Sequence, residues 1–184
     1  MDLEDQGGRL KLVTKRAEPY VVGKDFWRHK SLAQMNEAEW EALCDGCGKC
    51  CLHKLLDAEE AAEDTPSASM DAQETLYYTD VRCRYLDPQS ARCGCYSERL
   101  QKVADCVNIT LADLPHIHFM PPSCAYRRLH EGKELPPWHP LRHDGSRAPM
   151  RAAGVAVDAY PTVADDEIDE ADYELRIVTW PLND

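Results

Sequence analysis

The residues of this chain best suited to chemistry are its nine cysteines, and four of them follow one another in Cys44-Asp-Gly-Cys47-Gly-Lys-Cys50-Cys51. Four cysteine thiolates bind one zinc ion tetrahedrally, and four equally hold an iron–sulfur cluster. A CxxC turn brings two thiolates toward one ion, and Gly48 supplies the positive φ that such a turn requires. The sequence therefore predicts a cysteine-ligated metal centre. The other five cysteines are Cys83, Cys93, Cys95, Cys106 and Cys124.

The first four cysteines do not complete one mononuclear site by themselves. Cys50 and Cys51 are adjacent, and adjacent side chains of an extended segment project to opposite sides. The first three resemble the C-x2-C-x2-C start of a bacterial ferredoxin motif, but there the next cysteine comes four positions later rather than at once. A second CxxC pair is also missing. We therefore expect this quartet to share ligands with later cysteines, in two sites or one multinuclear site. Those later ligands are Cys83, Cys93, Cys106 and Cys124.

Metal ligation is favoured over disulfides by the compartment that the sequence predicts. The chain begins Met1-Asp-Leu-Glu-Asp5, without the basic and apolar regions of a secretory signal, so we expect a cytoplasmic protein with reduced thiols. The odd cysteine count would also leave one thiol over in any all-disulfide scheme. No apolar run approaches the roughly 18 residues that cross a bilayer, so we expect no membrane-spanning segment.

Acidic residues dominate the charge of the 184-residue chain, whose 33 Asp and Glu against 21 Lys and Arg give a formal net charge of −12. Seven acids and no base lie in residues 57–74, and another seven acids and no base lie in 165–174. We interpret both runs as solvated surface. Because nonspecific nucleic-acid binding depends on clustered Lys and Arg, no nucleic-acid partner is expected.

The elements that position the first cysteines are predicted to be short helices. The apolar pattern becomes helical from Asp25, through Phe26 and Trp27. Asn36 and Glu39 form a capping-box pattern that opens a second helix. Glycines after Cys44 end that helix, so the cysteine quartet begins at a helix terminus and continues through a turn.

The later cysteines are predicted to lie on a hairpin and near two further helices. Residues 75–81 are β-prone, and Asp87-Pro88 marks a turn, so a hairpin would place Cys83 near Cys93. Residues 97–104 have helical spacing. We expect Ser123 to cap a helix that runs to Glu131 and ends at Gly132.

The rest of the chain is predicted to be less regular. Residues 135–140 contain three prolines and should form an extended strap that packs Trp138 on the body. Residues 155–157 and 174–179 alternate weakly and are predicted as late strands. Together the patterns predict an α+β fold: a small, helix-rich, loop-heavy domain organised around a cysteine-ligated metal centre. Residues 1–24 are interpreted as a poorly ordered leader, and residues 161–184 as an acidic C-terminal extension.

These residues carry a resemblance to a known family. The cysteine quartet, followed by Cys83-Arg-Tyr-Leu, resembles the CxxCxxCC family of zinc- or iron-chelating domains, and the flanking sequence is similar to its YcgN-like bacterial branch. The resemblance covers roughly residues 25–160, and so many specific stretches make chance similarity improbable. The matching stretches are Phe26-Trp27, Glu39–Leu55, Cys124–Arg127 and Leu135–Leu141.

The resemblance implies that zinc or iron is bound through eight recurrent cysteines. It leaves Cys95 as the extra cysteine, and the acidic stretch 58–72 as a loop inserted into a metal-binding domain of residues 25–160. The eight implied metal ligands are Cys44, Cys47, Cys50, Cys51, Cys83, Cys93, Cys106 and Cys124.

Several other residues have both a functional and an ordinary interpretation. His53 is expected at the surface, at a helix start, with metal ligation as the alternative. His116 and His118 are expected in a loop rather than at a metal. His139 is expected to serve packing or hydrogen bonding. Lys49 is expected to be a solvated lysine, with compensation of thiolate charge as the alternative.

The sequence contains no Ser-His-Asp order, phosphate-binding glycine loop or H-E-x-x-H helix, so it identifies no catalytic residues. Three hypotheses follow: an iron or iron–sulfur protein, a structural zinc module that binds a protein partner, and a thiol–disulfide oxidoreductase. The third is weakest, because the first CxxC pair follows a predicted helix rather than a strand. Sulfur ligands alone do not distinguish zinc from iron.

Overall fold

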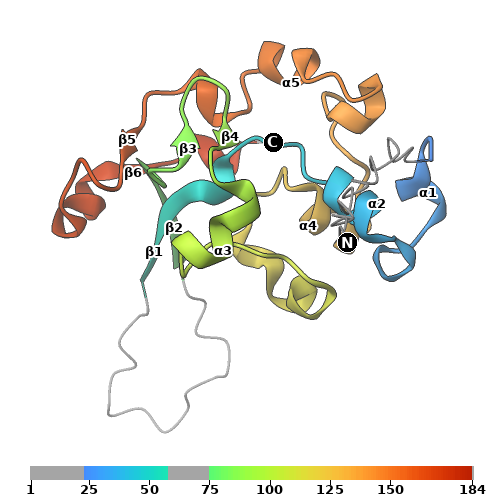
Figure 1. Cartoon of the computed structure of the whole chain (residues 1–184), viewed down its shortest axis with the longest axis horizontal. Coiled ribbons are helices and arrows are strands. Elements are labelled where there is room, and N and C mark those ends of the chain that lie inside the picture. The colour runs from blue at the N-terminus through green and yellow to red at the C-terminus, as the bar shows by residue number, and fades with distance from the viewer. Residues whose placement is uncertain (1–22, 58–74, 184) are drawn as a thin grey trace, which may run out of the picture.

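The computed structural model describes residues 23–57 and 75–183, and they form a mixed α+β fold (Figure 1). The predicted leader, except for its last two residues, and the predicted acidic insertion at 58–72 lie outside the described residues. The boundaries of the predicted metal-binding domain stay predictions.

Most elements of the fold are short. In the described ranges the α-helices are α1 (Phe26–His29), α2 (Glu37–Ala42), α3 (Arg99–Lys102), α4 (Ala125–His130) and α5 (Ala148–Ala152). The strands are β1 (Leu52–Asp57), β2 (Thr75–Arg82), β3 (Leu86–Asp87), β4 (Arg92–Cys93), β5 (Val163–Ala164) and β6 (Ile177–Val178). The 3₁₀ helices are η1 (Leu32–Gln34), η2 (Lys49–Cys51), η3 (Tyr96–Glu98), η4 (Leu111–Phe119), η5 (Pro140–His143), η6 (Val157–Ala159), η7 (Glu170–Arg176) and η8 (Trp180–Leu182).

Strand β2 is the centre of the main sheet. It pairs antiparallel with β1 on one side, and along its other side it pairs with β5 in parallel and with β6 antiparallel. The β-prone segment 75–81 is thus confirmed as a strand. The predicted hairpin is also confirmed, because β3 and β4 pair antiparallel with Leu86 opposite Cys93. The sheet fixes the chain immediately after Cys51 and immediately before Cys83.

Helix α2 begins with the capping box that the sequence predicts. The Asn36 side chain accepts a hydrogen bond from the Glu39 N–H at 3.0 Å, and the Glu39 carboxylate accepts one from the Asn36 N–H at 3.0 Å. Lys30 Nζ donates to the same carboxylate at 2.6 Å and is the main cause of its lowered pKa. These contacts fix the helix that leads directly into the first cysteine.

Three sequence predictions are wrong in detail. Ser123 does not cap α4: the N-cap is Cys124, without a side-chain cap bond, and the Ser123 hydroxyl instead accepts a hydrogen bond from Lys49. Residues 155–157 form no strand, because Val157 begins 3₁₀ helix η6. The strand predicted over 174–179 is only the two residues of β6, since η7 occupies the chain up to Arg176.

The interior consists of two hydrophobic clusters. The first packs the N-terminal helices against η4 and α4, and includes Phe26, Leu43 and Tyr126. The second packs the sheet and hairpin against the later chain, and includes Tyr78 and Trp138. The expectation that the proline strap packs Trp138 on the body is confirmed, since 8 % of this residue is exposed. In Figure 1 the chain between α2 and β1 connects these two parts of the molecule.

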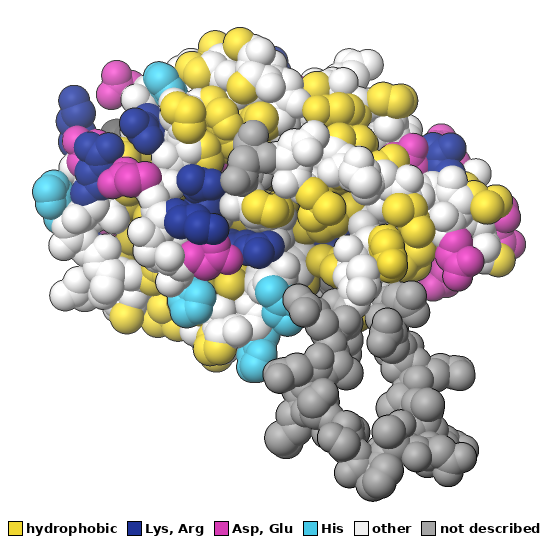
Figure 2. Space-filling model, turned by 180° about the vertical axis from the view of Figure 1, so that it is seen from behind, with side chains coloured by type: hydrophobic (Ala, Val, Ile, Leu, Met, Phe, Trp, Pro, Cys, Tyr) yellow, Lys and Arg dark blue, Asp and Glu magenta, His cyan; other side chains and the backbone are white. Residues whose placement is uncertain are grey.

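On the face that Figure 2 shows, no single type of side chain dominates the surface. There the Lys and Arg side chains form small groups beside Asp and Glu, with hydrophobic side chains around them. Within residues 23–57 and 75–183, no helix combines the length and the apolar composition needed to cross a bilayer.

We predict that Gly48→Ala destabilises the fold more than Gly132→Ala. Both glycines have positive φ, +79° and +72°, so an alanine costs about 1–2 kcal/mol at either position. A Cβ on Gly48 would also lie 3.3 Å from side-chain atoms of Leu86 and Val157, which adds about 1–3 kcal/mol for overpacking. Among the described residues other than its two chain neighbours, none has an atom within 4 Å of a Cβ on Gly132. Urea unfolding of both variants measures the difference, and equal losses would contradict it.

Candidate metal centre

The segment from Cys44 to Cys51 is a tight loop that the rest of the fold holds by its backbone. The Cys44 N–H donates to Glu41 O at the end of α2 at 3.2 Å, and the Val157 N–H donates to Cys47 O at 2.8 Å. The Cys51 N–H then donates to Gly48 O at 2.9 Å, which closes the turn of η2. The helix end followed by a turn, expected for the cysteine quartet, is therefore confirmed.

Arg147, at the start of α5, supports the same loop from outside. Its Nη2 donates to Gly46 O at 2.6 Å and its Nη1 donates to Ser90 O at 3.0 Å. The φ of +71° favours glycine at position 46, where a Cβ would make only ordinary van der Waals contact with Arg147, at 3.6 Å from Nη2. One side chain thus fixes the cysteine loop to the β3–β4 hairpin. The sequence gives no signal for this role, because Arg147 lies about 100 residues beyond the loop.

Lys49 is buried, not solvated, so the ordinary interpretation of this lysine is wrong. Only 1 % of the residue is exposed. Its Nζ donates to Ser123 Oγ at 3.2 Å and to Asn183 O at 3.0 Å. Because Ser123 precedes Cys124, the lysine also links the cysteine loop to the start of α4. Burial of an ammonium group is costly unless it is hydrogen-bonded, and these two contacts supply that bonding.

A second ammonium group lies on the other side of the cysteine turn. Lys54 Nζ donates to Cys50 O at 3.1 Å and to Leu52 O at 2.9 Å, and lies 5.2 Å from the ring centroid of Tyr78. Burial lowers the pKa of Lys54, while Cys50 and Cys51 act in the opposite direction. Its charge in turn favours ionisation of the Cys50 thiol.

The fold brings Cys124 to the cysteine loop and so forms a first thiol group. Its members interact electrostatically with one another: Cys50 affects the pKa of each of the other three. Burial is the largest cause of the raised pKa of Cys47, and it raises the pKa of Cys124 to about 12. Cys44 is exposed as a residue, but protein atoms around its thiol still raise its pKa to about 12. The first thiol group is Cys44, Cys47, Cys50 and Cys124.

A second thiol group forms where the sheet meets the hairpin. The Cys83 N–H donates to Cys51 O at 2.9 Å, which places these residues side by side. The hairpin returns Cys93 toward Cys83, as predicted, and both affect the pKa of Cys106. Burial is the main cause of the raised pKa of Cys83 and of Cys106. The second thiol group is Cys51, Cys83, Cys93 and Cys106.

The two thiol groups meet at Cys50 and Cys51. Their sulfurs are 4.0 Å apart, while Cys50 packs against the first hydrophobic cluster and Cys51 against the second. The contact between the two thiols lowers the pKa of Cys50 to about 7 and raises that of Cys51. The two neighbours thus belong to different sides of the molecule, although η2 is helical rather than extended.

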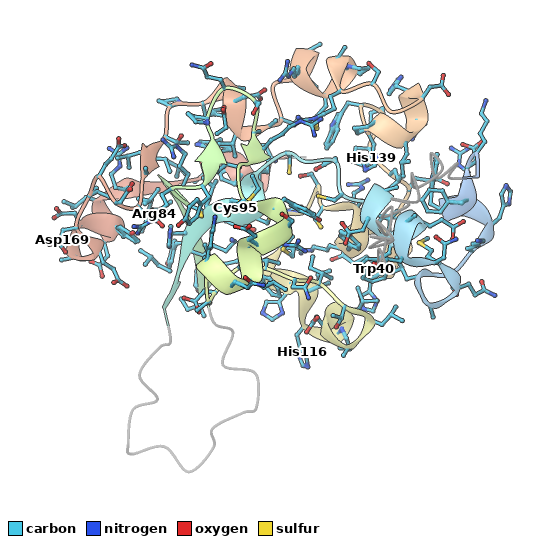
Figure 3. All side chains as sticks on the ribbon, in the orientation of Figure 1. Trp40, Arg84, Cys95, His116, His139 and Asp169 are labelled. Atoms are coloured by element: carbon cyan, nitrogen blue, oxygen red, sulfur yellow. The ribbon has the colours of Figure 1, made fainter. Side chains whose placement is uncertain are left out.

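Cys95, the ninth cysteine, lies beside the second thiol group. Its sulfur is 3.8 Å from that of Cys93, and 8 % of the residue is exposed. Figure 3 shows Cys95 in the middle of the molecule, near α3 and the hairpin. Burial and contact with Cys93 raise its pKa. By position alone, Cys95 is not distinguished from the four cysteines of the second thiol group.

The histidines do not join either thiol group. His53 lies in β1 rather than at a helix start, with its Nε2 3.4 Å from Asp165 Oδ2. His116 and His118 are exposed in 3₁₀ helix η4 rather than in a loop, and Figure 3 shows His116 at the edge of the molecule. His139 is fully buried, and the predicted packing and hydrogen-bonding role is confirmed. Its Nδ1 accepts from the Leu141 N–H at 3.2 Å, so Nε2 carries the proton and donates to Leu43 O at 3.1 Å.

The thiols lie close together, but their side chains are not arranged as ligands around one point. Within the described part of the chain, no three His, Cys, Asp or Glu side chains are placed so that they would hold one metal ion. The donor set nevertheless fits zinc or iron chemically, because clustered thiols are ligands that both metals accept. The Lys54 ammonium group, which favours ionisation of Cys50, suits the negative charge that thiolates bring.

Known proteins resemble this chain over most of its length. The CxxCxxCC family model, described as "Putative zinc- or iron-chelating domain", matches residues 43–125, which include all nine cysteines. A UPF0260 protein of Parvibaculum lavamentivorans is 50 % identical over 157 residues, 85 % of this chain and 93 % of the relative. UPF0260 proteins of Shewanella pealeana (45 %, covering 86 % and 97 %) and Cronobacter sakazakii (43 %, covering 84 % and 95 %) are similar. No solved structure matches the chain.

We predict that Arg147→Ala lowers the free energy of unfolding by about 3–6 kcal/mol, because it removes two hydrogen bonds from a charged donor and each contributes about 1.5–3 kcal/mol. The matched control is Arg151→Ala on the same helix. Arg151 is half exposed and pairs with Asp158 at 3.2 Å, so its loss should cost less than about 1 kcal/mol. Urea unfolding of both variants tests this. Equal losses would show that Arg147 does not support the cysteine loop.

Proposed function

Because the chain belongs to the UPF0260 family and carries its CxxCxxCC domain, we propose that it binds zinc or iron through its clustered cysteines. The observation that carries this proposal is the gathering of eight cysteines, from five separate segments of the chain, into two adjoining thiol groups. A polypeptide that keeps so many thiols close to one another suits a soft metal.

We assign the metal ligands to two adjoining sites that meet at Cys50 and Cys51. The first site takes Cys44, Cys47, Cys50 and Cys124, and the second takes Cys51, Cys83, Cys93 and Cys106. This division is supported by the way Cys50 and Cys51 pack against different hydrophobic clusters. Four thiolates per site are enough for a tetrahedral zinc ion and also for an iron–sulfur cluster. Cys95 is left as a neighbour of the second site.

The thiol–disulfide oxidoreductase hypothesis receives less support. Such enzymes need an accessible cysteine whose pKa lies below its usual range, so that the thiolate forms at neutral pH. Burial instead raises the pKa of Cys44 and Cys47, the first CxxC pair. In the overlapping pair Cys47 and Cys50, the pKa of Cys50 is lowered, but this residue is only partly exposed. A structural zinc module remains the alternative role for the metal. It requires that metal removal unfolds the chain, because structural zinc binding is coupled to folding.

We predict that protein purified anaerobically contains zinc or iron, and that disrupting either thiol group removes part of it. Cys44→Ser/Cys47→Ser and Cys83→Ser/Cys93→Ser should each lose about half of the bound metal, because each pair supplies ligands to only one site. The control Cys95→Ser should retain all of it. Metal analysis with determination of acid-labile sulfide measures the content and distinguishes zinc, iron and a cluster. A wild-type chain free of both metals would refute the proposed function.

We predict that the apparent affinity for Zn²⁺ rises with pH. With their raised pKa values, Cys44, Cys47 and Cys124 are protonated at neutral pH in the metal-free chain, so binding must release their protons. Each thiol that ionises on binding makes the affinity rise about tenfold per pH unit below its pKa. Competition with a chromophoric chelator between about pH 6 and 8 measures the slope. An affinity independent of pH would exclude these thiols as ligands.

A further inference from the structure

Asp45 is a buried carboxylate with one oxygen left without a partner. Only 8 % of the residue is exposed. Its Oδ1 accepts a hydrogen bond from the Cys47 N–H at 2.9 Å, whereas its Oδ2 has no hydrogen-bond partner among the described residues. A buried carboxylate oxygen without a partner is costly, because it has lost water and gained nothing in exchange. This oxygen is therefore suited to a partner that binds after folding.

The residue that carries the unpartnered oxygen lies in the same loop as three cysteines of the first thiol group. Asp45 lies between Cys44 and Cys47 in the loop, and the hydrogen bond to the Cys47 N–H fixes its carboxylate within that loop. Its negative charge contributes to raising the pKa of each of the four cysteines of this group. A carboxylate among four thiols opposes their ionisation as long as no cation is present. A bound cation reverses this effect, because it attracts carboxylate and thiolates alike.

Two basic side chains lie near Asp45 without donating a hydrogen bond to its Oδ2. The two Nη atoms of Arg147 donate to Gly46 O and Ser90 O, and its buried Nε, like Asp45 Oδ2, has no hydrogen-bond partner among the described residues, although the guanidinium interacts electrostatically with Asp45. Both ring nitrogens of His139 are hydrogen-bonded, to Leu43 O and to the Leu141 N–H. Neither side chain therefore satisfies Asp45 Oδ2. Because Asp45 lies between Cys44 and Cys47, the sequence itself places this carboxylate in the cysteine loop.

We propose that Asp45 Oδ2 is an oxygen ligand of the metal ion bound by the first thiol group. The inference rests on the proposed function and extends it. Zinc accepts carboxylate oxygen as well as sulfur, and carboxylates also bind iron in mixed donor sets. A donor set that contains oxygen differs from the closed four-sulfur site of a structural zinc module. The first site is then chemically distinct from the second, whose assigned ligands are all cysteines.

The test compares the full-length wild-type chain with Asp45→Asn and with a control, Asp80→Asn. Asparagine keeps the acceptor for the Cys47 N–H but removes the charge. Asp80 is a partly buried carboxylate of β2 whose two oxygens already accept hydrogen bonds from Arg176, at 2.7 and 2.8 Å. Zn²⁺ affinity is measured by chelator competition. The visible absorption bands of bound Co²⁺ report the number and type of its ligands.

Asp45→Asn should weaken binding at one of the two sites by about 10- to 100-fold, the range found when groups that support a metal site are removed. It should also change the Co²⁺ bands, while Asp80→Asn matches the wild type in both measurements. The metal-free Asp45→Asn chain should melt no lower than the wild type, because it loses an unpartnered buried charge. Unchanged affinity and bands in Asp45→Asn would overturn the inference.

A second variant keeps the inference testable if Asp45→Asn does not fold. Asp45→Glu retains the charge but moves the oxygen by one methylene, so it should bind Co²⁺ with shifted bands; bands identical to those of the wild type would overturn the inference. The two proposals fail in different ways. A wild-type chain that binds neither Zn²⁺ nor Co²⁺ removes both. Normal wild-type binding with an unaltered Asp45→Asn variant removes only the assignment of Asp45.

Discussion

The turn that contains Cys50 and Cys51 is the constraint on which the rest of this fold depends. It is the point where the two hydrophobic clusters meet, with one sulfur packed on each and 4.0 Å between them. Gly48 permits the turn, because its positive φ and the closeness of Leu86 and Val157 leave no room for a side chain. The helices on one side and the sheet on the other are therefore joined through thiols rather than through a larger apolar side chain.

Burial and charge act against each other at this junction. Burial favours the neutral thiol, as the raised pKa values of Cys47 and Cys124 show. Lys54 introduces positive charge at the turn and favours ionisation of Cys50, while the buried Lys49 bonds to Ser123 and Asn183. Buried ammonium groups are costly unless negative charge develops beside them. The arrangement therefore suits a centre whose negative charge appears when thiolates form, which a divalent metal brings about.

The sequence predicted the local elements better than the way they are joined. Asn36 and Glu39 form a capping box because its contacts lie within one helical turn, and β2 follows its β-branched and aromatic residues. The sequence did not distinguish two metal sites from one multinuclear site, because the separation of the two thiol groups depends on long-range packing. Lys49 looked solvated because its burial is decided by Ser123 and the chain terminus, far along the sequence. No pattern marks Arg147, whose role exists only in three dimensions.

The cysteine loop is better understood as a chelating loop that the protein holds closed than as a reactive one. Its backbone is fixed by α2, by Val157 and by Arg147, so its thiols cannot move apart without breaking these contacts. A redox loop needs a thiol that ionises readily and reaches a substrate. In this loop Asp45 disfavours each thiolate of the first thiol group, whereas Cys51 and Lys54 favour ionisation of Cys50 alone. Cys44, Cys47 and Cys124 therefore stay neutral thiols without a cation, which suits a chelating loop better than a nucleophilic one.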